Sequence, residues 1–434
     1  MARSLNIMMS LFTRRCEGTF YRALPWASFL VSRGHRVTIL CTSKDNLFRI
    51  KVSEENGVHI IETPALFSGR FIMTRLCGMY GWGPLDILAR WREARRGGYD
   101  LAVAFEHHLH VVLPLYLAGR KRIPVWIADS CDHYGKGGFR EFEYSPYRLY
   151  RLYQLIGWPF RTLMDHMEMS IRRKADAVTV ISTYIRDRVV GQGIPTEKVH
   201  LIPGSAETEN IHVQPKADAC RQMGLDPDLH YALFFGAGQF DVDFSLEAFE
   251  RVQRKMPDSC FIVVGKKDPA VTRKASGLGI QEKIIQTGWI EEGQLGDWLA
   301  CADVCLLPMK DNAPNHARWP NKIGFYMAAG RPVVATNVND IGPLIRRQQM
   351  GRTCLVDVQG FADQVVELFE NPPAAAEMGR RARETAEHDF AIPIQGEVLE
   401  QLCFDLLAAC AEGEVDPVRR EQVSGASTPG FHDA

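Results

Sequence analysis

The sequence predicts an α/β protein built from two Rossmann-like, doubly wound domains that face a cleft. Short apolar segments typical of buried strands alternate with longer amphipathic segments typical of helices, which favours parallel sheets covered by helices. The alternation occurs twice, with a turn-rich stretch at residues 203–215 between the two series. At 434 residues, the chain also exceeds the length at which a single core usually divides.

The first series gives the strands expected in an N-terminal domain, residues 1–205. They are LNIMMSLF (5–12), RVTIL (36–40), VHII (58–61), LAVAF (101–105), PVWIA (124–128), AVTVIS (177–182) and VHLIP (199–203). Ligands of doubly wound sheets bind beyond the carboxyl ends of the strands. The loops that follow these segments are therefore the first places to look for a site.

The second series gives the strands of a C-terminal domain, residues 206–390. They are YALFFG (231–236), CFIVVG (260–265), KIIQTG (283–288), DVCLLP (303–308), RPVVAT (331–336) and TCLVDV (353–358). Helices are expected at 373–388 and 391–412, the second packing back toward the N-terminal domain. Residues 413–434 are polar and rich in small side chains, which predicts a disordered tail.

Composition argues against several classes of function. The 51 basic and 52 acidic side chains leave a net charge of −1, so no overall field favours nucleic acid. The 11 cysteines include no C-x-x-C pair, which argues against a disulfide framework or a zinc site and fits a reducing compartment. No run approaches the roughly 18 apolar residues of a membrane span, and no signal peptide is recognised. A cytoplasmic protein is expected.

The segment NHARWPNKIGFYMAAGRPVVAT (315–336) carries the most informative local pattern. Pro320 suits the first turn of a helix and Gly330 the position past its end, so a loop, a short helix, a turn and a strand are expected. Arg318 and Lys322 lie within one turn of that helix start, where unpaired N–H groups attract anions. The pattern predicts a cradle for a diphosphate, although similar segments occur in α/β proteins without a ligand.

Several segments, taken in order, resemble glycosyltransferases of the GT-B fold and of family 4. They are SRGHRVTILCTS (32–43) after Gly18, ADAVTVISTYIRDRVVGQGIPTEKVHLIPG (175–204), FFGAGQFDVDFSLEAFERV, TGWIEEGQLGDWLACADVCLLP and RWPNKIGFYMAAGRPVVAT. The resemblance runs from about residue 5 to residue 412. It implies retaining transfer of a sugar from a nucleotide-sugar substrate, bound mainly by the C-terminal domain. It also implies no metal and no cofactor, because protein cations and helix ends hold the diphosphate.

The chain departs from the family pattern at three places. Family members often carry two glutamates separated by seven residues, where this chain has Ala317 and Phe325. The loop after YALFFG lacks the usual Arg and Lys, and the Glu of a Gly-Gly-x-Pro-Glu segment falls near Pro343. Two interpretations stay open. Donor binding is rebuilt around an RWPNK-type loop, or the protein is a catalytically reduced, donor-binding or scaffold subunit.

The first interpretation draws the donor site from three loops. A lone glycine is weak evidence, and an arginine in the first loop is equally compatible with a solvated surface cation. The residues expected to bind the donor are Arg14, Gly18, Gly236, Gly238, Asn315, His316, Arg318, Asn321, Lys322 and Phe325, with Arg318 and Lys322 also stabilising the leaving diphosphate.

Two polar segments follow strands of the N-terminal domain and are expected at the acceptor side of the cleft. Asp132, then Asp129 and His133, are candidates to orient or deprotonate the acceptor hydroxyl, unless they only build a turn. Glu106 and His107 are candidates for acceptor contact, with a plain helix start as the alternative. Adjacent histidines on a strand point apart, so the EHHLH run predicts no metal site.

Two amphipathic stretches mix aromatic and basic residues, at 66–98 and 139–174. Such mixtures suit a membrane interface, although a core-facing helix with arginine stems over it is the common alternative. Interface binding would imply a glycan or lipid-linked acceptor and peripheral attachment to the inner face of the cell membrane. A dehydrogenase is disfavoured because no strand is followed by G-x-G-x-x-G. A sugar-nucleotide epimerase on the same fold stays open.

Overall fold

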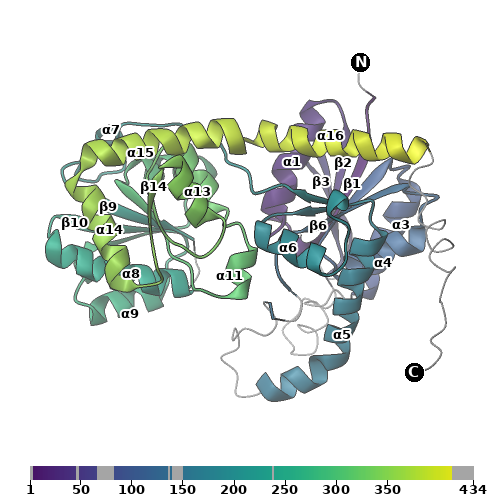
Figure 1. Cartoon of the computed structure of the whole chain (residues 1–434), viewed down its shortest axis with the longest axis horizontal. Helices are drawn as coiled ribbons and strands as arrows, with labels where there is room; N and C mark the ends of the chain where they lie inside the picture. Colours follow the sequence, from purple (N-terminus) through teal and green to yellow (C-terminus); the bar gives the residue numbers. More distant parts are fainter. Residues whose placement is uncertain are drawn as a thin grey trace, which may run out of the picture.

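The computed structural model describes residues 3–44, 48–65, 83–134, 137–138, 150–236 and 239–412. In this part of the chain, two sheets covered by helices lie side by side, and a long helical segment near the C-terminus runs across both (Figure 1). The predicted fold class is confirmed. Gly238, most of residues 66–98, the beginning of residues 139–174 and the tail at 413–434 lie outside the described residues.

The N-terminal sheet has eight strands in the order β3-β4-β2-β1-β5-β6-β7-β8. All neighbours are parallel except β3 and β4. The strands are β1 (Asn6–Arg14), β2 (Arg36–Thr42), β3 (Lys51–Glu55), β4 (Val58–Thr63), β5 (Leu101–Phe105), β6 (Val125–Ser130), β7 (Ala177–Val180) and β8 (Val199–Leu201). The sequence prediction omitted β3 because this edge strand, KVSEE, is largely exposed and charged, so it lacks the apolar run of a buried strand.

The C-terminal sheet has six parallel strands in the order β11-β10-β9-β12-β13-β14. They are β9 (His230–Phe235), β10 (Ser259–Val264), β11 (Ile284–Gly288), β12 (Val304–Leu307), β13 (Val333–Thr336) and β14 (Gly351–Cys354). The strand expected at 353–358 was therefore placed too late. Its apolar residues Leu355 and Val356 are 77% and 39% exposed and lie in the loop that follows β14.

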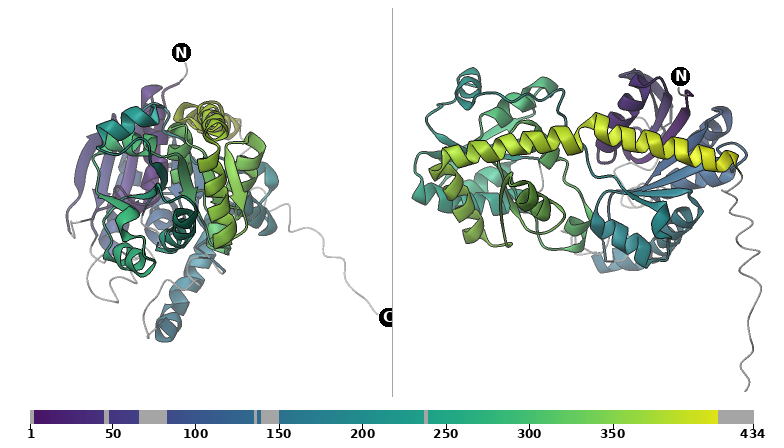
Figure 2. Two further views of the ribbon diagram at one scale, coloured as in Figure 1. Left: turned by 90° about the vertical axis from the view of Figure 1, so that its left-hand side faces the viewer. Right: turned by 45° about the horizontal axis from the view of Figure 1, so that its top comes forward.

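Helices cover both faces of each sheet (Figures 1 and 2). They are α1 (Phe20–Ser32), α3 (Pro84–Arg96), α4 (Leu109–Ala118), α5 (Tyr150–Lys174), α6 (Thr183–Gly191), α7 (Lys216–Gln222), α8 (Gln239–Lys255), α9 (Pro269–Gly277), α10 (Leu295–Ala300), α11 (Ala313–Ala317), α12 (Lys322–Ala328), α13 (Ile341–Gln348), α14 (Val358–Glu370), α15 (Pro372–Thr385) and α16 (Ile392–Ala411). A π-helical turn, η4 (Ala386–Phe390), joins α15 to α16. Within the described part of the chain, no helix is long and apolar enough to cross a membrane.

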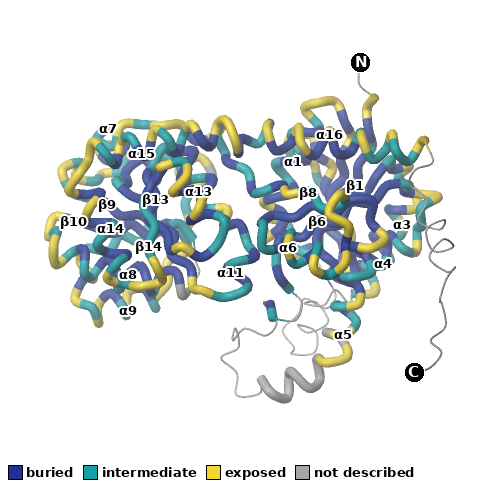
Figure 3. Tube along the Cα trace, in the orientation of Figure 1, coloured by how far each residue is buried: buried dark blue, intermediate teal, exposed yellow. Residues whose placement is uncertain are grey.

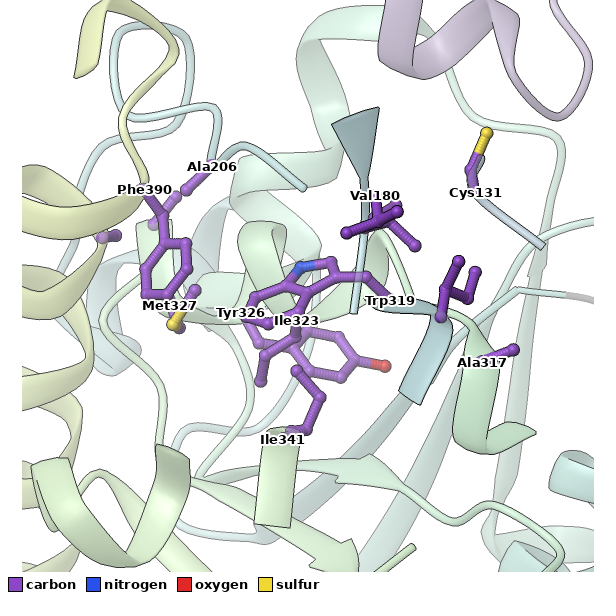
Figure 4. Close-up of a cluster of buried hydrophobic side chains, with 14 of the residues drawn as sticks. Cys131, Val180, Ala206, Ala317, Trp319, Ile323, Tyr326, Met327, Ile341 and Phe390 are labelled. Atoms are coloured by element: carbon purple, nitrogen blue, oxygen red, sulfur yellow. The ribbon is translucent and has the colours of Figure 1, made fainter. Parts of the chain in front are cut away.

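The chain crosses between the two sheets twice, and the two crossings lie side by side. Ala206, just after β8, pairs with Ala391, and its N–H donates to the Phe390 carbonyl over 2.6 Å. Figure 4 shows Trp319 with Phe390 and Ala206 on one side and Val180 on the other. Buried residues lie on both sides of this junction (Figure 3), and one cluster of buried residues includes side chains from both domains.

Helix α16 then packs against α1 of the N-terminal sheet (Figure 2). Glu400 on α16 accepts hydrogen bonds from Arg33 and lies 2.8 Å from the His35 ring. Gly396 faces Phe29 so closely that a Cβ there would lie 2.3 Å from the Phe29 ring. These contacts tie the end of the described chain to the first helix.

Candidate functional site

The loop that carries Arg318 touches the N-terminal domain at the start of α6. Ser182 Oγ donates to the Ala317 carbonyl over 2.5 Å, and the Tyr184 ring stacks on His316 at 5.9 Å. Thr183 N–H and its hydroxyl both donate to Asp340, the residue before α13. The predicted donor loop is therefore also a contact between the domains.

Arg318 and Lys322 come together, as their spacing predicts, but they share a carboxylate that sequence reasoning missed. Asp241 Oδ2 lies 3.5 Å from the Arg318 guanidinium and 3.7 Å from Lys322 Nζ. The Lys322 ammonium also lies 3.9 Å from the centre of the Phe234 ring. The pKa of Lys322 is lowered to about 8. Burial is the largest cause; the Asp241 charge opposes it, and the Arg318 charge adds to it.

Lys322 is the first residue of α12, so the helix begins two residues later than Pro320, where the sequence prediction placed it. The Tyr326 hydroxyl, one turn on, accepts a hydrogen bond from Phe235 N–H over 2.9 Å and donates to the Leu306 carbonyl over 3.2 Å. These bonds fasten the helix to the carboxyl ends of β9 and β12. Lys322 is thereby held beside the end of β9.

The backbone after β9 favours glycine beside Lys322. Gly236 has φ = +125°, a conformation that side chains rarely adopt, and a Cβ there would lie 3.5 Å from Lys322 Nζ. Phe325, at the second missing glutamate position, packs edge-on against Phe235 with ring centres 5.5 Å apart. This face of the site is aromatic where the family pattern has a carboxylate.

Other predicted donor residues are engaged within the loop. Asn315 donates to the Lys310 carbonyl over 2.8 Å, and His316 lies 2.7 Å from the Asp311 carboxylate. Asn321 is exposed at the start of α12. Asn339, which sequence reasoning did not single out, donates to the backbone carbonyls of Asn315 and Arg318 and so fixes the loop's course.

Asp132 is the predicted residue from the N-terminal domain on which the Arg318 charge acts. Its N–H donates to Glu106 Oε1 over 3.0 Å, and the Tyr134 hydroxyl donates to its Oδ2 over 3.2 Å. Burial and the nearby Glu106 charge raise the pKa of Asp132 to about 7, and the Arg318 charge partly opposes that rise. Groups from both domains therefore act on one carboxyl.

Asp129 is not positioned to meet an acceptor. It is buried on β6, where Arg22 donates to both its carboxylate oxygens over 3.1–3.3 Å and Thr179 donates to Oδ1 over 2.7 Å. Arg22 also donates to the Ile202 and Pro203 carbonyls. The structure thus assigns Asp129 to a buried ion pair that joins α1 to the start of the linker.

His133, Glu106 and His107 lie in the same buried polar region. His133 Nε2 accepts a hydrogen bond from Arg188 Nε over 3.0 Å, which ties that nitrogen to α6. Glu106 has φ = +69°, and its Oε2 lies 3.5 Å from His107 Nδ1. Because Glu106 also accepts from the N–H groups of Cys131 and Asp132, it shapes the loop after β6.

Arg14 ends β1, and Gly18 lies in the loop between β1 and α1. Gly18 has φ = +50°, and a Cβ there would lie 2.8 Å from Thr13 Cγ2, so both backbone and space favour glycine. Arg14 is half-buried at the end of β1. No contact within the described residues links either one to Arg318 or Lys322.

Two family models match the chain, one on each domain. "Glycosyltransferase Family 4" matches residues 21–210, and "Glycosyl transferases group 1" matches residues 230–371. Together the matches include most of α1, Asp132, Asp241 and the segment that carries Arg318 and Lys322.

The curated relatives are distant. A GDP-mannose-dependent α-(1-6)-phosphatidylinositol monomannoside mannosyltransferase of Mycolicibacterium smegmatis is 26% identical over 255 residues, which are 57% of this chain and 67% of the relative. A putative teichuronic acid biosynthesis glycosyltransferase, TuaH of Bacillus subtilis, is 27% identical over 187 residues, 41% of this chain and 44% of the relative. The chain thus spans between about half and two thirds of these relatives.

Solved structures share the fold over nearly the whole chain. Sucrose-phosphate synthase of Thermosynechococcus elongatus superposes with a TM-score of 0.73 at 18% identity, covering 94% of this chain and 100% of that one. Anabaena HepE in complex with UDP and glucose gives 0.66 at 13% identity, covering 92% and 99%. The structures establish the fold and the family models establish the enzyme class: the chain is a GT-B glycosyltransferase similar to family 4.

Proposed function

We propose that the protein transfers a sugar, with retention of configuration, from a nucleotide-sugar to a glycan or lipid-linked acceptor in the synthesis of an envelope polysaccharide or glycolipid. The observation that carries the proposal is the pair Arg318 and Lys322 beside the Asp241 carboxylate, together with the effect of the Arg318 charge on Asp132 of the other domain. The mannosyltransferase relative is GDP-mannose-dependent, and HepE is solved with UDP-glucose, so both nucleotides are candidates.

In the proposed reaction, Arg318 and Lys322 hold the donor diphosphate. As the bond from the anomeric carbon to the diphosphate oxygen breaks, negative charge grows on the leaving group and these fixed cations stabilise it. The acceptor oxygen forms its bond to the anomeric carbon on the same face. Its proton passes to the leaving phosphate or to ionised Asp132, which orients the hydroxyl.

The domain contact at α6 supports this arrangement. Ser182 holds the residue before Arg318 and Thr183 holds Asp340, so the contact between the domains helps to place the donor loop. Closure excludes water, and hydrolysis of the donor is the side reaction to suppress. The acceptor is expected to approach along the N-terminal domain, where Asp132 lies.

We further propose that α5 brings the protein to a membrane surface. Met164, Met167 and Ile171 on its C-terminal half are buried, and Arg172 pairs with Glu168 over 2.6 Å, so this half belongs to the core. The other half projects from the body of the protein, with Trp158 63% exposed (Figure 1). An exposed tryptophan on a projecting helix suits the interfacial region of a bilayer.

The test combines donor and variant. Purified protein is assayed with GDP-mannose and UDP-glucose for transfer to a panel of lipid-linked acceptors and for donor hydrolysis. Arg318→Ala should lower turnover at least tenfold, about the loss of one charged contact made in the transition state. Arg352→Ala, which removes a half-buried arginine paired with Glu367, is the matched control and should leave turnover unchanged. Near-normal turnover of Arg318→Ala would refute the assignment of the donor site.

A further inference from the structure

Asp241 is an acidic residue placed between the two cations that would grip an anionic donor. We propose that Asp241 is a positioning residue of the donor site, which holds Arg318 and Lys322 in place and keeps the Lys322 ammonium charged before the donor binds. The inference deepens the proposed function and rests on it. Nothing in the spacing of the sequence singled out Asp241, because it lies 77 residues before Arg318.

Asp241 is held in a buried turn at the start of its helix. Asp241 lies in the first turn of α8, is buried, and is followed by the buried residues Val242 and Phe244. Ser245 Oγ donates to the Asp241 carbonyl over 2.7 Å. The backbone that carries Asp241 is thus held in a buried helical turn, and its carboxylate faces Arg318 and Lys322.

The distances leave the cations available. Charge-assisted N–H···O bonds usually measure about 2.7–2.9 Å. Asp241 Oδ2 is 3.5 Å from Arg318 and 3.7 Å from Lys322, so it orients both side chains without consuming their donors at close range. Arg318 Nε is buried and has no hydrogen-bond partner among the described residues. A buried donor of this kind is what a diphosphate oxygen would satisfy.

The charges explain why a counter-ion is needed. Lys322 is faced by Asp241 from α8 and by Arg318 from the loop before α12, while the Phe234 ring of β9 covers it; Arg318 in turn faces Asp132 after β6. Burial and the Arg318 charge both favour neutral lysine. With the pKa of Lys322 at about 8 despite the help of Asp241, losing that carboxylate would leave the amine mostly neutral near pH 7.5.

A purely structural explanation is that Asp241 only favours the start of α8, since acidic residues suit a first helical turn. Asp243 separates the two explanations. It lies two residues further along the same helix and faces Lys274 at 3.9 Å instead of the donor cations. Asp243→Asn is therefore the matched control for Asp241→Asn.

The first measurement needs no donor. With ¹³C- and ¹⁵N-labelled lysine, the Lys322 side chain is titrated by NMR in wild type, Asp241→Asn, Asp241→Glu and Asp243→Asn. Asp241→Asn should lower the Lys322 pKa by about one unit, a typical effect of removing one nearby opposite charge. Asp241→Glu should largely restore it, and Asp243→Asn should leave it unchanged. An unshifted Lys322 titration in folded Asp241→Asn would overturn the inference.

The second measurement uses GDP and UDP as probes, by calorimetry at pH 6.5 and pH 8.0. If binding needs charged Lys322, a one-unit shift makes the ratio of variant to wild-type Kd rise about fourfold between these pH values for Asp241→Asn. Ionisation of the nucleotide itself cancels in that ratio. A constant ratio would overturn the positioning role. Failure of wild type to bind either diphosphate would instead count against the proposed function, while the lysine titration still decides the role of Asp241.

Discussion

Asp132 allows the electrostatics of the site to be tested through stability alone. Burial and Glu106 raise its pKa from 3.8 to about 7, so the folded protein prefers the neutral carboxyl. Between these two values, the folded state binds the proton more tightly than the unfolded state does. The free energy of unfolding must therefore fall as pH rises from about 4 to about 7, and the loss is complete above the folded pKa.

The magnitude follows from the size of the shift. A rise of roughly three pKa units corresponds to about 4 kcal/mol, and about 3 kcal/mol of this is lost between pH 5 and pH 8.5. Asparagine at position 132 has almost the same shape, stays neutral, and keeps an oxygen to accept from Tyr134 and an N–H to donate to Glu106. Asp132→Asn should therefore be more stable than wild type, by an amount that grows by about 3 kcal/mol over this pH range.

The assay is urea unfolding of wild type and Asp132→Asn at pH 5 and pH 8.5, followed by tryptophan fluorescence. Asp187→Asn is the control, because this aspartate of the same domain has a side chain that is 69% exposed. It should show no pH-dependent difference from wild type. If the difference in unfolding free energy between Asp132→Asn and wild type is the same at both pH values, burial does not raise the pKa of Asp132.

Three further outcomes follow from the geometry. The kcat/KM for the donor should rise near pH 7 as Asp132 loses its proton and fall above about pH 8 as Lys322 loses its own, because this ratio reports ionisations of the enzyme without donor; a broad plateau from pH 6 to pH 10 would contradict both roles. Arg22→Ala leaves Asp129 buried without its partner and should cost about 3–5 kcal/mol in urea unfolding, so a loss under about 1 kcal/mol would show that the pair is dispensable. Gly324→Ala places a Cβ 2.4 Å from the Ser205 carbonyl oxygen and should cost about 1–3 kcal/mol in the same assay. No loss of stability would show that the linker yields without strain.

The fold could be predicted where buried strands are apolar along their whole length. Strands of a parallel sheet covered on both faces are continuous apolar runs, and β5, LAVAF, is buried at every position. The edge strand β3 lacks such a run, and the exposed pair Leu355 and Val356 imitates one beyond β14. The omitted strand and the misplaced strand both lie at the edge of a sheet, where a strand can be polar and an apolar residue can be exposed.

The site could be predicted only as far as local spacing reaches. Arg318 and Lys322 lie four residues apart, so one helix start predicts their proximity. Asp241 belongs to the first turn of a different helix, and only the folding of α8 beside α12 brings it to them. Asp129 and Asp132 look alike in sequence, yet Arg22, 107 residues before Asp129, decides which of the two is locked in an ion pair.

Where the chain departs from the family pattern, charged residues of the site come from other segments. The resemblance leads one to expect cations in the loop after β9 and carboxylates at positions 317 and 325. Here, Ala317 is fully buried against Ser182 and Phe325 packs on Phe235, so neither position offers a carboxylate. The carboxylate comes instead from α8, as Asp241, and it faces the cations of the 318–322 segment. The missing glutamates were the reason to consider a subunit without turnover. The cluster of Arg318, Lys322 and Asp241 still offers a diphosphate two cations held by one carboxylate, so the choice between the two interpretations falls to the assay of transfer and donor hydrolysis.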